Sequence, residues 1–136
     1  MSDYFGAMGT AIYSKLAKGT ALITALGGTA IYADQAPDGY PWPFVIFSHV
    51  AGGPMNITPR DMRENIWWIR AYAPTRAAAA AIDGEVEQLL HKGTITVNAW
   101  TVFWLAREQD IMRVENLPDG KKVHMAGGMY RVRISA

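Results

Sequence analysis

The sequence predicts an α+β fold: a mainly antiparallel β-sheet, with some parallel pairing left open, and two to three helices packed on one face. Residues 76–92 carry apolar side chains at helical spacing. Several other segments are rich in β-branched and aromatic residues, which is typical of strands, and the connections between elements are short. Helices grouped on one face of an antiparallel sheet define this class.

The composition predicts one domain over residues 1–136, with a buried core, because half of the residues are hydrophobic. The 13 basic and 12 acidic residues give a net charge of +1, so neither nucleic acid nor an anionic membrane is expected as the main partner. The absence of cysteine excludes disulfides, thiolate metal sites and a cysteine nucleophile. We expect no export signal, because the first residues lack a basic segment and a long apolar run, and no apolar run approaches the ~20 residues of a membrane helix.

The first half of the chain predicts two helices before the first strands. They cover residues 7–18 and 21–26, with Thr20 as the expected N-cap of the second helix. Gly27-Gly28 is expected to end that helix, because glycine tolerates positive φ. An extended segment begins at Ile31-Tyr32, and Pro37-Asp38-Gly39 predicts a turn.

The remaining elements are five strands and the long helix 76–92, for which Thr75 is the expected cap. The strands are predicted at 44–50, 64–73, 95–97, 100–108 and 123–134. Residues 51–54 are expected to end the first of these, and a bulge is predicted at Gly127-Gly128. Strands 64–73 and 100–108 are apolar on both faces, which favours cover from a neighbouring subunit over a sheet that closes on itself.

Residues suited to catalysis form no recognisable motif. His49, His91 and His124 lie far apart and lack the spacing of metal ligands. The carboxylates of the long helix, Asp83, Glu85 and Glu87, do not share one face and are expected to be solvated. We therefore expect no enzymatic activity, no cofactor and no metal; a small enzyme that uses His49 or His124 is a remote alternative.

An ordered set of segments resembles the tail completion, or tail terminator, family of long-tailed phages and prophages. The set comprises Ile12–Leu16, Ala21–Gly28, Ile31-Tyr32, Pro41–Ile46, Ile66–Tyr72, Ala79–His91, Pro118-Asp119-Gly120 and Tyr130–Ile134. These residues determine a fold, so they support the fold more directly than the function.

The resemblance implies a ring, typically a hexamer, on the head-proximal end of the tail tube. There it would stop tube polymerisation and offer a surface for head–tail joining. Its partners would be further copies of the chain, the tail tube protein and the head–tail connector protein, and DNA would pass through without sequence-specific binding. Such a protein resides in the host cytoplasm during assembly and then in the virion. The alternative is a connector or stopper component of the neck.

Two regions are the candidates for contact with partners. The polar segment 52–63, if it forms a hairpin that meets the tube or a neighbour, supplies Met55, Arg60, Asp61, Met62 and Arg63. A solvated loop is the alternative interpretation. Arg131 and Arg133 share one face of the last predicted strand, where they would line a channel or contact phosphate, or else form an exposed face.

Overall fold

The computed structural model describes residues 4–36, 43–55, 61–118 and 120–135. The helices of this part are α1 (Tyr4–Ala17), α2 (Thr20–Leu26) and α3 (Arg76–Leu90). Its strands are β1 (Ile31–Ala33), β2 (Phe44–Pro54), β3 (Met62–Ala73), β4 (Thr101–Asn116) and β5 (Lys122–Ser135). The predicted α+β class is confirmed.

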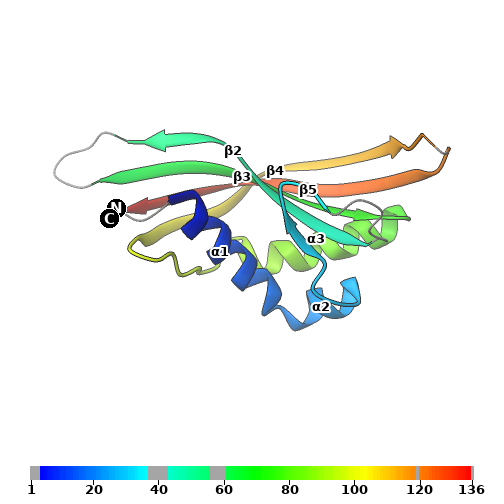
Figure 1. Cartoon of the computed structure of the whole chain (residues 1–136), viewed down its shortest axis with the longest axis horizontal. Helices are drawn as coiled ribbons and strands as arrows, with labels where there is room; N and C mark the ends of the chain where they lie inside the picture. The colour runs from blue at the N-terminus through cyan, green and yellow to red at the C-terminus, as the bar shows by residue number, and fades with distance from the viewer. Residues whose placement is uncertain (1–3, 37–42, 56–60, 119, 136) are drawn as a thin grey trace.

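The strands form one mixed sheet in the order β1-β2-β3-β5-β4. β1 runs parallel to β2, and the three other pairings are antiparallel. The β2–β3 and β4–β5 pairs are long and twisted, and their connecting ends lie at opposite ends of the molecule (Figure 1). The outer strands of the sheet are therefore β1, which is short, and β4, which is long.

All three helices lie on one face of the sheet (Figure 1). The apolar stripe of α3 is buried, as the helical spacing predicts, through Ala79, Ile82, Val86 and Leu90. On β3 the buried residues alternate with half-buried ones, because successive side chains of a strand point to opposite faces. The main core is thus enclosed between the helices and one face of the sheet.

The opposite face of the sheet is covered by none of the described helices (Figure 1). A small apolar cluster of Ala30, Phe44 and Ile46 lies there, with Tyr72 packed against it. Further along the same face β3 and β5 carry half-buried side chains, many of them charged. The prediction that strand 64–73 is apolar on both faces therefore holds for β3, whose Ile66, Trp68 and Tyr72 lie on this face.

The caps of α2 and α3 follow their local sequence with one difference, and α1 begins at Tyr4, before its predicted start at residue 7. The Thr75 hydroxyl accepts a hydrogen bond from the Ala78 N–H at 3.2 Å, so Thr75 caps α3 as predicted. Gly27 ends α2 in the left-handed region, with φ of 74°. The N-cap of α2 is Gly19 rather than Thr20, which is the first helical residue. The turn predicted at residues 37–39 lies outside the described residues.

Two strands extend beyond their predicted ends. β2 continues to Pro54, because a register shift between His49 and Ala51 lets pairing with β3 resume. Gly52 has a φ of 135°, which other residues rarely adopt, and this conformation allows β2 to continue past the register shift. β4 continues to Asn116, because β5 pairs with it along its whole length. The glycine pair predicted to end β2 thus lies inside it.

The remaining differences concern strand 95–97 and the predicted bulge. Residues 95–97 form no strand, only an isolated bridge from Val97 to Trp100. Gly127 and Gly128 pair without interruption in β5. The register shifts lie in β4 instead, between Val102 and Trp104 and between Arg107 and Gln109. The turn at 117–120 is confirmed by a 2.9 Å hydrogen bond from the Gly120 N–H to the Leu117 carbonyl.

Candidate assembly surfaces

The predicted contact segment between β2 and β3 is a hairpin rather than one long loop. The Met55 N–H donates to the Met62 carbonyl at 2.7 Å, and Pro54 pairs with Arg63. Asp61 is exposed, whereas Met55, Met62 and Arg63 are half-buried. Arg60 lies outside the described residues. The contact role of these five residues remains a prediction, and among the four described ones Asp61 is the most accessible.

Arg63 has a structural partner within the chain. Its guanidinium lies 5.0 Å from the ring centre of Tyr4 and 5.8 Å from that of Trp100. Cations over aromatic faces are attracted by the ring quadrupole. Burial raises the pKa of the Tyr4 hydroxyl to about 12, and the Trp67 indole and the Arg63 charge oppose this rise. Arg63 therefore ties the β2–β3 hairpin to the start of α1.

Arg131 and Arg133 lie on the sheet face away from the helices, where each is paired with a carboxylate. Arg131 contacts Glu64 and donates to Glu108 at 2.7 Å. Arg133 donates to the second oxygen of Glu64, also at 2.7 Å. These hydrogen bonds and charges hold the pKa of Glu64 below its usual value, the bond from Arg133 contributing most. The two arginines predicted to share this face of β5 are thus compensated by Glu64 and Glu108.

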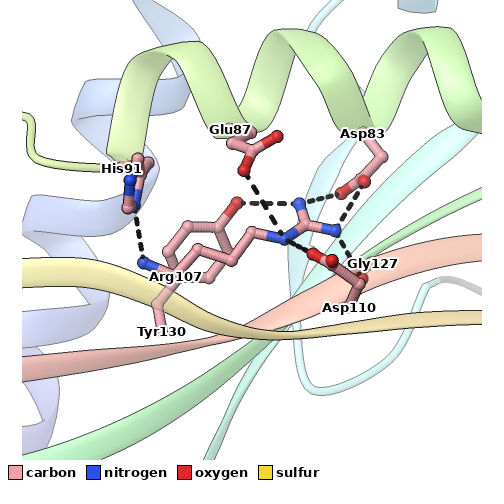
Figure 2. Close-up of polar contacts among 7 residues, drawn as sticks. All are labelled: Asp83, Glu87, His91, Arg107, Asp110, Gly127 and Tyr130. Carbon is pink, nitrogen blue, oxygen red and sulfur yellow. Dashed lines mark hydrogen bonds and ion pairs between the residues drawn. The ribbon is translucent and has the colours of Figure 1, made fainter.

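Figure 2 shows a second polar network, on the helix side of the sheet, centred on Arg107. Its guanidinium donates to both carboxylate oxygens of Asp83, at 2.9 and 2.8 Å, and to the Gly127 carbonyl at 2.8 Å. It also donates to the Tyr130 hydroxyl at 3.3 Å and to Asp110 at 2.6 Å. Only 6% of the Arg107 side chain is exposed.

The Arg107 network joins α3 to the irregular part of β4. Burial would lower the pKa of Arg107, but the hydrogen bonds with Asp83 and Tyr130 outweigh this and raise it. At the end of α3, His91 Nδ1 accepts from the Arg107 N–H at 3.0 Å. The prediction that Asp83 is solvated is therefore wrong, because Asp83 is the main partner of Arg107. No local pattern signals this pairing across 24 positions.

The other two histidines lie in two separate environments. His49 Nε2 and the Asn65 side-chain oxygen lie 2.9 Å apart, and the His49 ring packs edge-on against Phe5 and Trp67. His124 lines a shallow pocket with Arg76, Met112 and Val114. Within the described residues, no group of three or more histidines and carboxylates is arranged to hold a metal ion. None of the described helices is long and apolar enough to cross a membrane.

The two long hairpins and the sheet face that none of the described helices covers are the candidate assembly surfaces. The family model described as Tail completion protein gp17 matches residues 10–127. The chain therefore belongs to the tail completion protein gp17 family, and the resemblance seen in its sequence is confirmed. Family membership makes it a structural protein of tail assembly.

Solved structures share the fold at low sequence identity. A chain from the virion of a native gene transfer agent particle aligns over 100% of both chains, with a TM-score of 0.77 and 16% identity. A second solved chain aligns with a TM-score of 0.56 and 14% identity, over 97% of this chain and 96% of its own. Identity at this level establishes the fold alone. No curated protein matches the chain.

Proposed function

We propose that the protein forms a closed ring on the head-proximal end of the tail tube, where it ends tube polymerisation and presents a surface for head–tail joining. Membership of the tail completion family carries the proposal. The full-length structural match with a chain of a gene transfer agent virion supports a place in a phage-like particle. A protein of this kind assembles in the host cytoplasm, remains in the virion and catalyses no reaction.

The ring, typically a hexamer, contacts the tail tube protein on one side and the connector protein on the other. A ring needs a heterologous interface, in which two different surfaces of each copy meet. The connecting ends of the two hairpins lie at opposite ends of the molecule, which suits contacts with different partners (Figure 1). The β2–β3 hairpin, with Met55, Arg60, Asp61, Met62 and Arg63, is the proposed contact with the tube or a neighbour.

DNA passes through this ring without sequence-specific binding. Tight binding of DNA depends on Lys and Arg side chains that neutralise phosphates. Arg131 and Arg133 are already engaged by Glu64 and Glu108, so these two side chains offer little free positive charge. If these arginines line the channel, the paired carboxylates weaken the contacts of the arginines with phosphate. Weak contacts favour the passage of DNA over its retention in the ring.

A polymerisation assay tests the proposal. Tail tube protein is allowed to polymerise with increasing amounts of this protein, and tube length is measured by electron microscopy. We expect tubes to stop growing at one end. Asp61→Lys should weaken this effect, whereas the matched reversal Lys18→Glu, at an exposed site after α1, should leave it intact. Unrestricted growth at all ratios contradicts the proposal, and binding to the portal side alone favours a neck connector.

A further inference from the structure

Among the described residues, no strand covers the outer edge of β4 over its distal half. Nearer its start, the Lys92 N–H donates to the Leu105 carbonyl at 2.8 Å and His91 Nδ1 accepts from the Arg107 N–H at 3.0 Å. From Gln109 to Asn116, no other described strand lies along this edge, because β5 occupies the inner side. An uncovered edge presents unpaired N–H and C=O groups to another strand.

A second uncovered edge lies on the opposite side of the same sheet. β1 pairs only with Val45–Phe47 of β2, whereas β2 continues to Pro54. Among the described residues, the outer edge of Ser48–Pro54 therefore has no strand beside it. The two open edges belong to opposite sides of one sheet, so a contact between them in two copies is heterologous.

Apolar side chains accompany both open edges. On distal β4, Met112 and Val114 are 46% and 53% exposed. Met112 lies opposite Ala126, a residue of the main core, so its side chain points to the helix side of the sheet. Exposed apolar side chains gathered on one projecting element are a feature of interaction sites.

A pocket of about 240 Å³ opens where β1 ends and the edge of β2 becomes free. Its lining comes from α1, β1, β2 and β3, through Phe5, Gly9, Ala33, Asp34, Phe47, His49 and Trp67. Phe47 and Trp67 belong to the main core, so this pocket also lies on the helix side of the sheet. Phe5 is 57% exposed. The pocket and the Met112–Val114 pair thus lie on the same side of the sheet, at opposite edges.

We infer that distal β4 of one copy docks along Ser48–Pro54 of the next copy, with Met112 and Val114 against the pocket beside Phe5. Strand addition of this kind gains backbone hydrogen bonds, and the side-chain pocket sets the register. The interface joins unlike surfaces and repeats around a ring. This inference rests on the proposed ring and identifies the surfaces that build it.

Charge complementarity favours a second copy of this chain as the occupant. The charged residue of the pocket is Asp34, which is exposed. Near Met112 and Val114, the exposed basic residue Arg76 lines the shallow pocket of distal β4, whereas Arg113 pairs with Met125 and points to the other face of the sheet. Opposite charges therefore come together when the two surfaces meet, which steers association and fixes register.

Cross-linking tests the inference, because the chain contains no cysteine. Met112→Cys and Val50→Cys proteins are mixed under conditions of ring formation and treated with a short bismaleimide. We expect dimers in the mixture and none with either protein alone, and a ladder of oligomers from the double variant. The control replaces Met112→Cys by Phe103→Cys, at a site 48% exposed on the same strand but roughly 30 Å away at ~3.3 Å per residue.

Aspartate substitutions give a second readout that depends on no cross-linker. Met112→Asp/Val114→Asp should weaken ring formation at least tenfold with little change in melting temperature, because both residues are exposed. Phe103→Asp should leave ring formation unchanged. Rings whose subunits fail to cross-link at these sites, or link equally through Phe103→Cys, overturn this inference alone. Absence of any ring, with and without tubes, overturns the proposed function as well.

Discussion

Arg107 of β4 and Asp83 of α3 form a two-pronged ion pair, with N–O distances of 2.9 and 2.8 Å. Both side chains are mostly buried, with 6% and 14% of their surface exposed. The pair connects the long helix to the strand whose distal half is proposed to meet a neighbour. The network of Figure 2 therefore fixes the position of β4 relative to the helices.

Asp83→Asn should destabilise the fold by about 3 kcal/mol, because removing one member of a buried pair leaves the other charge uncompensated. Asp110 and the Gly127 carbonyl still accept from Arg107, which keeps the loss at the lower end of the usual range. The matched control is Glu87→Gln, since Glu87 is 47% exposed and 3.9 Å from Arg107. Glu87→Gln should lower the free energy of unfolding by less than ~1 kcal/mol. Equal losses in urea unfolding of the two variants would refute this role for Asp83.

Gly128→Ala should also disturb the Arg107 network. A Cβ at Gly128 would lie 2.7 Å from Arg107 Cζ, closer than side chains normally approach. We expect a loss of roughly 1–3 kcal/mol from overpacking, measured by thermal or urea unfolding. Gly84→Ala is the control, because no atom lies within 4 Å of its added methyl group. That change should stabilise α3 by up to ~1 kcal/mol, and a similar effect of both substitutions would argue against the prediction.

Alkaline pH should destabilise the protein through two buried tyrosines. Burial raises the pKa of both Tyr4 and Tyr130 to about 12, from an ordinary value of 10.0. The contribution of these two tyrosines to the free energy of unfolding is thus complete below pH 10 and is lost as the pH rises toward 12. Tyr4→Phe and Tyr130→Phe should each reduce the slope of unfolding free energy against pH in this window. Slopes identical to that of the wild type would show that the tyrosines ionise equally well in both states.

Acidic pH should act through Glu64. Its pKa is lower in the fold than its ordinary value of 4.5, because Arg133 and Arg131 stabilise the carboxylate. The contribution of Glu64 to the free energy of unfolding is therefore present at pH values above its ordinary pKa. It disappears as the pH falls through the lowered pKa of the folded state. Glu64→Gln should flatten the loss of stability in that window, as measured by urea unfolding at successive pH values. An unchanged acid profile would show that the pairs with Arg131 and Arg133 contribute little.

The sequence predicts best the elements whose pattern is local. α3 follows from its apolar spacing and the cap at Thr75, and both are present. The length of β4 could not be predicted in this way, because its apolar pattern ends near Ala106 and the rest is held by pairing with β5. β2 passes through Gly52-Gly53 for the same reason, since its register with β3 decides its course.

Prediction of the candidate surfaces from the sequence is limited in the same way, because they too depend on contacts between distant residues. The sequence marks the hairpin residues and the arginines of β5, but not that Arg131 and Arg133 share Glu64. The buried role of Asp83 depends on Arg107, 24 positions away, and on a register shift in β4. Contacts of this kind arise from topology, and the open edges of the sheet likewise appear only once the strand order is known.

The proposed terminal ring is tested by negative-stain electron microscopy of the purified protein, alone and mixed with tail tubes that lack their terminal ring. We expect closed rings at one end of each tube, and tubes that no longer elongate when fresh tube protein is added. Tubes that stay undecorated and continue to grow in excess protein would show that the protein does not terminate them.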